Sequence, residues 1–458
     1  MVVPTLESAM TSERCGDAAA CCDPQPFDND RRPRLDAKTL ALTLAFCAAC
    51  RGSTPGDPAA AAEAPTIPMD VEWTQFGGPA QNFKVPDYGL AETWPREGPP
   101  RLWTRKLGPG YSGIVARRHR LYTMYRSDPE EVVVCLDARN GETIWEYRYA
   151  SSPAKGHDHE YGDGPNASPL LAGDRVYTIG VAGVMHCLDA DDGRVLWSRD
   201  LWLELGGTFL ELGYSSGPIA YKDHVIVLVG GKDRGAVALD QEDGHVVWKG
   251  LSFENSYSTP MIMNIHGEDQ LIAFMATEVI GADPNSGVLK WRYLFRNSYP
   301  QNICMPSQAA DDLLVISTLE TGSRGLRIAA SGSPLVEEAW ATTRFQCFYS
   351  STVLLGDHLY GVSGYQSSPR LIALDARTGE LAWRKRGFAV ANLVAAGDHL
   401  LILDEEGKLT LATPGPDGVE VHAEARVLVE PARTPPTIVG TVLFARDFHS
   451  VVALDLGR

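Results

Sequence analysis

Polar side chains able to bind a ligand gather in five segments that interrupt the apolar runs of the chain. They bring together imidazole, carboxylate, amide, guanidinium and phenol groups, which fix a ligand by hydrogen bonding. The candidate ligand-binding residues are His157, Asp158, His159, Glu160, Asn166, Glu211, Tyr214, Glu254, Asn255, Tyr257, Asn297, Tyr299, Asn302, Arg344, Gln346 and Tyr349. Tyr161, Arg296 and Gln301 belong to the same segments.

The run from His157 to Tyr161 also has the residue types of a metal site. Imidazole and carboxylate groups suit a divalent ion. Consecutive ligands on a Gly-rich loop lack the fixed spacing that a helix gives, so a solvated loop is the alternative. Of the two, the solvated loop is favoured, and we predict no resident metal.

A sequence repeat accounts for the spacing of these polar segments along the chain. Asp is followed by Gly four residues later and by Trp four residues after that, and this pattern occurs five times. The copies are Asp137, Gly141, Trp145; Asp189, Gly193, Trp197; Asp240, Gly244, Trp248; Asp283, Gly287, Trp291; and Asp375, Gly379, Trp383. Repetition at a fixed period indicates a repeat architecture.

Two further copies are degenerate. Successive Asp positions lie 52, 51, 43 and 92 residues apart, and Asp375 lies 80 residues before a final Asp455. Trp340 falls in the first long gap, and Gly418 with His422, in place of Trp, falls in the second. Counting both, the chain holds eight units.

Each unit reads as short strands joined by tight turns. Alternating Val, Leu, Ile and Tyr are interrupted by G-D, D-G or T-G, which are hairpin signals. Asp caps such a turn, Gly takes a left-handed backbone angle, and Trp fills the space between neighbouring sheets. The fold class is therefore all-β: a single eight-bladed β-propeller of four-stranded antiparallel blades. The strand around Trp103 pairs with the C-terminal strand ending at Asp455 and closes the ring.

The repeat residues and the loop residues have different roles in such a ring. Repeated Asp, Gly and Trp residues, together with Trp103 and Asp455, hold the blades together. The loops that lead from an outer strand to the next inner strand share one face around the central channel, where function gathers. Cys304 and Cys347 occupy matching places in adjacent blades, so they could form a disulfide in an oxidising compartment. Cys135 and Cys187 are expected to be core residues.

Composition and the N-terminus restrict the partners and the location. The formal net charge is -17, which argues against nucleic acid as a partner. A basic cluster at 31–38 precedes an apolar run at 39–49 and then Cys50, an order typical of an export signal. We predict a disordered leader with a signal-like segment at 1–50, a low-complexity linker at 51–70 and the propeller at 71–458. Lipidation is predicted at Cys50.

The A-x-D-x-x-T-G-x-x-x-W repeat and the opening WTQFGGPAQN resemble the pyrroloquinoline-quinone-like repeat family from about Trp73 to Arg458. The resemblance implies either a quinoprotein dehydrogenase or a non-catalytic propeller such as the lipoprotein of the outer-membrane β-barrel assembly machinery. The dehydrogenases carry a vicinal cysteine pair beside the quinone, whereas the pair here, Cys21 and Cys22, precedes the signal-like segment.

We therefore predict a non-catalytic, monomeric binding scaffold with no catalytic residue and no cofactor. It is expected to be exported to the periplasm, outer membrane or cell surface of a bacterium, where a protein partner or small ligand binds the channel face. A dehydrogenase dependent on pyrroloquinoline quinone (PQQ) and calcium is the alternative function.

Overall fold

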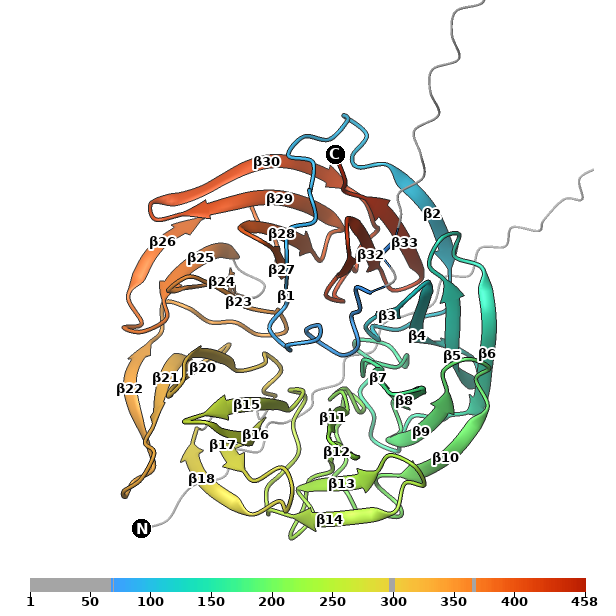
Figure 1. Ribbon diagram of the computed structural model, residues 1–458, viewed down its shortest axis with the longest axis vertical. Coiled ribbons are helices and arrows are strands. Elements are labelled where there is room, and N and C mark those ends of the chain that lie inside the picture. The colour runs from blue at the N-terminus through green and yellow to red at the C-terminus, as the bar shows by residue number, and fades with distance from the viewer. Residues whose placement is uncertain (1–66, 69, 296–300, 365–367) are drawn as a thin grey trace, which may run out of the picture. The chain divides into compact units, whose positions relative to one another are not determined.

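The computed structural model describes residues 67–68, 70–295, 301–364 and 368–458. The predicted leader, most of the linker and Cys50 lie outside these residues, as do Arg296, Asn297 and Tyr299. The described chain forms eight sheets around a central channel (Figure 1), which confirms the predicted eight-bladed all-β propeller. Within these residues we find no helix with the length and apolarity needed to cross a membrane.

The first four blades follow one another without interruption, and each runs from an innermost to an outermost strand. Blade 1 comprises β3 (Val115–Arg117), β4 (Arg120–Ser127), β5 (Glu130–Asp137) and β6 (Thr143–Ala150), and blade 2 comprises β7 (Leu170–Ala172), β8 (Arg175–Ile179), β9 (Val184–Asp189) and β10 (Val195–Asp200). Blade 3 comprises β11 (Ile219–Tyr221), β12 (His224–Leu228), β13 (Ala236–Asp240) and β14 (Val246–Gly250), and blade 4 comprises β15 (Met261–Ile265), β16 (Glu268–Phe274), β17 (Glu278–Ala282) and β18 (Leu289–Leu294).

The remaining blades include the two degenerate repeats and the closure of the ring. Blade 5 comprises β19 (Ser307–Ala310), β20 (Leu313–Thr318), β21 (Gly322–Ile328) and β22 (Val336–Thr342), and blade 6 comprises β23 (Val353–Leu355), β24 (His358–Ser363), β25 (Arg370–Asp375) and β26 (Leu381–Lys385). Blade 7 comprises β27 (Ala391–Ala396), β28 (His399–Asp404), β29 (Lys408–Gly415), β30 (Gly418–Arg426) and the added β1 (Lys84–Val85). Blade 8 comprises β31 (Thr437–Val439), β32 (Val442–Arg446), β33 (Ser450–Asp455) and β2 (Arg101–Lys106).

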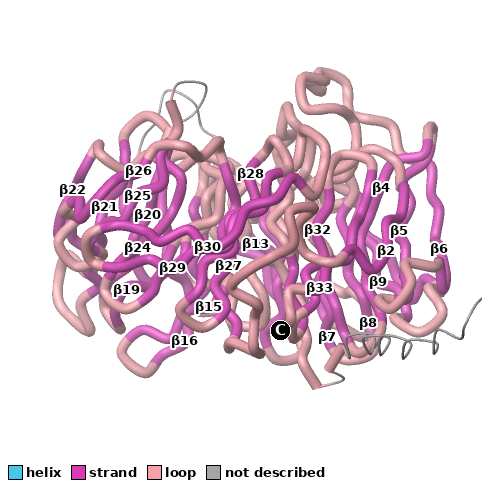
Figure 2. Tube along the Cα trace, turned by 90° about the horizontal axis from the view of Figure 1, so that it is seen from above, coloured by secondary structure: helices cyan, strands magenta, loops and turns pink. Residues whose placement is uncertain are grey.

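The ring closes as the sequence predicted. Strand β2 pairs antiparallel with β33, with Trp103 opposite Ala453, so the N-terminal strand completes the C-terminal blade. This pairing removes an open sheet edge, which would otherwise offer unpaired backbone groups to another chain. Figure 2 shows the strands running between the two faces of the propeller, with the connecting loops at each face.

The repeat residues join neighbouring blades. The Asp side chain accepts backbone N–H groups within its own turn, as Asp240 does from Glu242 at 2.7 Å. The Gly of the turn has a positive φ, for example +72° at Gly244, and the Trp ring of the preceding blade covers it so closely that a Cβ there would lie 2.6 Å from Trp197. The Trp197 indole N–H also donates to the carbonyl of Gln241 in that turn. The Trp therefore closes the boundary between blades, and Gly is required beneath it.

Two repeat positions depart from this arrangement. The Trp291 indole donates to the Gln270 side chain of its own blade at 2.8 Å, because blade 5 lacks an Asp-Gly turn to receive it. His422 replaces Trp in blade 7 and bonds to Thr413 of the neighbouring strand. In contrast, Trp340 of the degenerate blade 5 donates to the carbonyl of Ala376 and covers Gly379 as the intact copies do.

The four cysteines of the described chain are buried free thiols. Burial and a hydrogen bond shared with Cys347 hold the pKa of the Cys304 thiol well above its usual range, the hydrogen bond being the larger cause. The two side chains belong to one buried cluster, as their matching positions predicted, but they are thiols and not a disulfide.

A buried polar cluster lies between blades 1 and 2. The Glu131 carboxylate accepts the Tyr149 hydroxyl at 2.7 Å and the Val181 backbone N–H at 3.0 Å. The His186 ring lies 4.3 Å from the Tyr149 ring. Burial raises the pKa of Glu131 and lowers the pKa of His186 to about 4.

Acid is therefore expected to weaken the protein through His186. Its native pKa is below that of the unfolded chain, so its contribution to stability is complete above about pH 6.5 and is lost as the pH falls toward 4. That loss amounts to about 3 kcal/mol, and the raised pKa of Glu131 offsets part of it because the native state then takes up a proton more readily. Urea unfolding of His186→Phe should show a flatter acid limb and a stability close to the parent above pH 7; an unchanged acid limb would contradict this assignment.

Candidate functional site: a closed cup in the central channel

One end of the central channel is closed by the segment from Trp73 to Val85. Trp73 forms a bridge with Ala116 beside β3, and the Gln81 side chain donates to the carbonyl of Pro260 before β15. The segment then pairs as β1 with the end of β27. Since it touches blades 1, 4 and 7 in turn, it must cross the channel, as Figure 1 shows at the centre of the ring.

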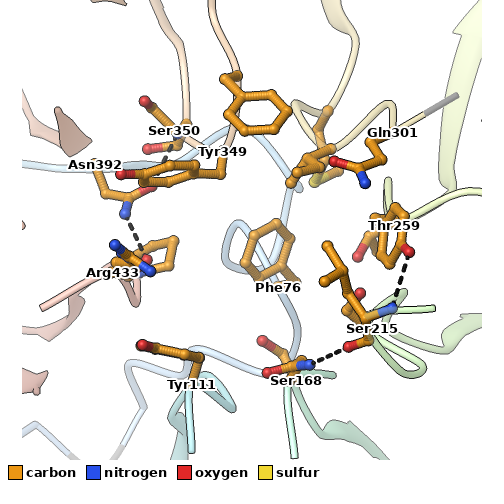
Figure 3. Close-up of a pocket in the computed structure, with 18 of the residues that line it drawn as sticks. Phe76, Tyr111, Ser168, Ser215, Thr259, Gln301, Tyr349, Ser350, Asn392 and Arg433 are labelled. Atoms are coloured by element: carbon orange, nitrogen blue, oxygen red, sulfur yellow. Dashed lines mark hydrogen bonds between the residues drawn. The ribbon is translucent and has the colours of Figure 1, made fainter. Parts of the chain in front are cut away.

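Above this segment the channel forms a cup of about 180 Å³. The described residues give it an aromatic and apolar lining with hydroxyl and amide groups and the Arg433 cation. The lining residues are Phe76, Phe83, Tyr111, Tyr161, Asn166, Ser168, Leu212, Ser215, Tyr257, Thr259, Gln301, Ile303, Met305, Phe348, Tyr349, Ser350, Ser351, Asn392, Arg433 and Pro435. In Figure 3 the labelled side chains surround Phe76, which belongs to the crossing segment.

The wall of the cup is built by equivalent positions in successive blades. Each blade contributes residues from just before, or at the start of, its innermost strand, as Ser168 does before β7 and Thr259 before β15. Small hydroxyl and amide groups at this level bind carbonyls of the next blade: Ser351 donates to Leu393, Asn392 to Arg433, and Thr434 to Tyr111. Much of the polar wall is therefore structural, and it holds the mouth of the channel at a fixed width.

Arg433 is the cation of the cup. Its guanidinium carbon lies 5.0 Å from the Tyr161 ring, 5.5 Å from the Tyr349 ring and 6.0 Å from the Tyr111 ring. Its Nε lies 3.4 Å from Glu405, which also accepts the Tyr349 hydroxyl at 2.6 Å. The side chain keeps 25 % of its surface exposed. This half-buried guanidinium is held in place by aromatic rings and one carboxylate. It therefore offers a fixed positive charge to a polar group of a ligand whose apolar part lies against the aromatic lining.

A second, wider cavity of about 500 Å³ adjoins the cup. It shares Tyr257 and Gln301 with the cup, and the Gln301 amide donates to Glu211 at 3.0 Å. Burial raises the pKa of Tyr257 to about 12, so its hydroxyl stays protonated. The other lining residues are Gly156, Thr208, Phe209, Leu210, Glu254, Asn255 and Ala276.

The structure divides the predicted site residues into three groups. Asn166, Tyr257 and Tyr349 line the cup, and Glu211, Glu254, Asn255 and again Tyr257 line the wider cavity. Tyr214 and Asn302 are buried and serve the fold: the Tyr214 hydroxyl donates to Leu228, and the Asn302 amide donates to Met275. Neither side chain lines the cup or the wider cavity. Among the described residues, His157, Asp158, His159, Glu160, Arg344 and Gln346 line neither cavity.

Sequence reasoning missed Phe76, Phe83, Tyr111, Phe348 and Arg433. The opening WTQFGGPAQN was noted for its resemblance alone, yet an aromatic pair beside Gly-Gly ahead of the first repeat was a signal for a segment outside the blades. Arg433 precedes Thr434-Pro435-Pro436 and had no such signal, since a single Arg in a loop is ordinary.

Among the described residues, the cup offers few groups for acid–base or nucleophilic catalysis. Its described lining residues include no carboxylate, imidazole or thiol. Ser215 stands within a G-x-S-x-G sequence from Gly213 to Gly217, but strand β11 follows it where a nucleophile elbow requires a helix. The arrangement is suited to binding.

Comparison with known proteins agrees with the repeat and the ring. The family model described as outer membrane protein assembly factor BamB matches residues 129–385, more than half of the chain. The chain belongs to this family. BamB of Yersinia pestis is 21 % identical over 311 residues, covering 63 % of this chain and 74 % of that protein. BamB of Shewanella oneidensis is 22 % identical over 336 residues, covering 70 % of this chain and 80 % of that protein.

Solved structures show the fold that the BamB family shares with other propellers. BamB from Moraxella catarrhalis matches with a TM-score of 0.56 at 16 % identity, over 78 % of this chain and 99 % of that one. Quinohemoprotein alcohol dehydrogenase from Comamonas testosteroni matches with a TM-score of 0.60 at 13 % identity, over 86 % of this chain and 82 % of that one. At these identities the likeness shows the fold alone, so the two types of propeller must be separated by the site.

Proposed function

We propose that this BamB-family propeller is a non-catalytic scaffold that binds a protein partner on the channel face. The observation that carries the proposal is the cup: an aromatic, closed-ended recess whose described lining residues include Arg433 but no carboxylate, imidazole or thiol, and which adjoins a wider cavity. Aromatic pockets with one guanidinium group are typical anchoring points of protein interfaces. A partner side chain in the cup and neighbouring residues in the wider cavity would be held together.

We further propose that the protein acts, as a monomer, at the bacterial cell envelope. Two features support this. The relatives are named as outer membrane assembly factors, and the N-terminal sequence has the basic, apolar and small-residue order of an export signal ending at Cys50. A lipid at Cys50 would keep the propeller at a membrane.

Site-specific photo-crosslinking in intact cells tests the binding face. A photoreactive phenylalanine analogue at Gln301, where the cup and the wider cavity meet, should crosslink a discrete protein. The same analogue at Arg377, an exposed residue of an outer blade turn, is the control and should give none. Crosslinks from Arg377 with none from Gln301 would place the partner on the outer edge and overturn the proposal.

The alternative, a calcium- and quinone-dependent dehydrogenase, does not fit the cup. Calcium takes several oxygen ligands and usually carboxylates, whereas the described lining residues offer only amide, hydroxyl and carbonyl oxygens. The thiols of the described propeller are buried and none is adjacent to another in sequence.

Titration of the full-length protein with PQQ and calcium checks this directly. We expect neither a rise in melting temperature nor alcohol-dependent dye reduction. Stabilisation accompanied by turnover would contradict the scaffold proposal and make the dehydrogenase the better assignment.

A further inference from the structure

The loop from Ser151 to Pro169, which joins blade 1 to blade 2, brings three potential metal ligands together. A nitrogen of His157, a nitrogen of His159 and a carboxylate oxygen of Asp163 all lie within 4.8 Å of one another. His157 Nε2 lies 3.3 Å from Asp163 Oδ1, and His159 Nδ1 lies 2.5 Å from the same oxygen. The sequence favoured a solvated loop over a metal site here, and it did not single out Asp163; the clustering of the three ligand atoms reverses that preference.

We propose that His157, His159 and Asp163 bind a divalent transition-metal ion of the zinc class. Bonds of about 2.0–2.1 Å in a tetrahedral site place neighbouring ligand atoms about 3.3 Å apart, which is the separation between His157 and Asp163. Two imidazoles and one carboxylate suit Zn²⁺, whereas Ca²⁺ and Mg²⁺ prefer oxygen ligands alone. Three protein ligands leave one position open.

The loop holds the first ligand in place before any ion arrives. The His157 side chain is only 2 % exposed, and its backbone N–H donates to the Ala154 carbonyl at 3.0 Å. The next residue, Asp158, donates its backbone N–H to Glu211 in the following inter-blade loop at 2.6 Å. The loop is thus tied to the loop between blades 2 and 3, and the His157 side chain has little order to gain when a metal binds.

The other two ligands face solvent, so an ion can enter. The His159 side chain is 67 % exposed and the Asp163 side chain 34 % exposed. His159 Nδ1 and Asp163 Oδ1 are hydrogen bonded to each other at 2.5 Å. A metal ion would take the place of this hydrogen bond, because imidazole and carboxylate bind metals in their deprotonated forms.

A second cluster in the chain provides a comparison. Asp240, Asp243 and His245 also place their ligand atoms within 4.8 Å of one another. They belong to a repeat turn in which Asp240 Oδ1 accepts the N–H groups of Glu242 and Asp243, and Asp243 accepts that of His245. The turn explains this cluster completely. His157, His159 and Asp163 lie outside the repeat turns, in the loop between β6 and β7.

The proposed metal would also act on the cup. Tyr161 lies between the second and third ligands in sequence, and its ring packs against the Arg433 guanidinium. An ion held by His159 and Asp163 would fix the short segment that carries Tyr161 and so hold one wall of the cup. Binding of metal would therefore reduce the mobility of a surface that the proposed partner contacts.

Metal titration of the full-length protein tests the site. Co²⁺ is used as a spectroscopic substitute for Zn²⁺, with Zn²⁺ as competitor, and the parent is compared with His159→Ala and Asp163→Asn. Both changes are at exposed ligands, so both variants should fold, as the melting temperature without metal will show. Because the N-terminal cysteines are present in every sample, the difference between parent and variant isolates this site.

We expect the parent to bind one more Co²⁺ ion than His159→Ala, with the visible bands of tetrahedral nitrogen and oxygen ligation, displaced by Zn²⁺. The affinity for Co²⁺ at this site should fall by about 100-fold or more in either variant. Mutation of a residue that only hydrogen-bonds to a metal ligand already commonly lowers metal affinity by about 10- to 100-fold. His245→Ala, the control in the second cluster, should bind as the parent does. Equal binding by the parent and His159→Ala, or loss of the ion in His245→Ala alone, would overturn the proposal.

Discussion

Replacing Trp248 by alanine is expected to lower the free energy of unfolding by about 3–5 kcal/mol, the usual range for removing a large buried aromatic side chain. Trp248 is 8 % exposed. Its indole N–H donates to the Pro284 carbonyl of blade 4 at 3.0 Å, and its ring covers Gly287 so closely that a Cβ there would lie 2.5 Å away. The change removes the contact that joins blades 3 and 4, and chemical denaturation measures the loss.

Three further substitutions separate the loss of this contact from the loss of side-chain volume. Trp248→Phe keeps most of the ring but leaves the Pro284 carbonyl without its donor, which should cost about 1–3 kcal/mol. Gly287→Ala forces a Cβ into the Trp248 ring at φ +70°, whereas Gly267→Ala, at φ +82° with no atom within 4 Å, tests the backbone angle alone. Gly287→Ala should be clearly the more destabilising of the two. Equal effects, or an unchanged unfolding curve for Trp248→Ala, would exclude the role in joining blades.

The blades were predictable because their code is local and repeated. An Asp, a Gly four residues later and a Trp four further on specify a turn and its neighbour, whatever the rest of the chain does. Trp340 shows how far this extends, since it packs correctly although the Asp-Gly part of its own unit has been lost. Trp291 shows where prediction from the repeat fails. The position of its ring depends on whether the next blade has an Asp-Gly turn to receive it, and the sequence of one unit does not reveal this.

The cup was only partly predictable because contacts between distant segments build it. The loops before the innermost strands could be placed on one face from the repeat, and Asn166, Tyr257 and Tyr349 do line the cup there. Whether a tyrosine in such a loop faces the channel or the core depends on packing: Tyr257 lines the cup, but Tyr214 is fully buried.

The closing segment was beyond prediction for a related reason. The Gln81 side chain bonds to the backbone at Pro260 and Ile262, 179 and 181 residues away. No periodic pattern marks a strap that crosses a channel.

The boundary between blades 8 and 1 depends on a buried cation, and Arg446→Ala is expected to cost about 3–5 kcal/mol. Arg446 is 1 % exposed. Its Nη1 donates to the carbonyls of Ser112 and Met124 and to the Thr123 hydroxyl, all in blade 1, at 3.0, 2.9 and 3.1 Å. Alanine would remove these three hydrogen bonds, although the Ser112 carbonyl keeps the Thr123 hydroxyl as a donor, and it would open a cavity at the boundary.

The burial of the Arg446 charge is itself unfavourable, and this limits the stability lost when Arg446 is replaced. Burial lowers the pKa of Arg446 to about 10, so the folded protein holds this charge at a cost. At neutral pH the group is charged in both folded and unfolded states, and only above about pH 10 would the unfolded chain bind more protons, so that its contribution to stability rises with pH there. Arg446→Met, which fills the volume without the charge, should therefore lose less stability than Arg446→Ala.

Hydrogen exchange locates the effect at this boundary, because Arg446→Ala should accelerate exchange in β32 and β3 before blades 3 and 4 respond. The matched control is Arg377→Ala, whose ion pair with Asp357 is more than half exposed and should change stability by less than about 0.5 kcal/mol. A loss below about 1 kcal/mol for Arg446→Ala, or exchange that accelerates uniformly around the ring, would mean that the blade 8 to blade 1 boundary is held by the docking of Trp103 on Gly141 and needs no buried charge.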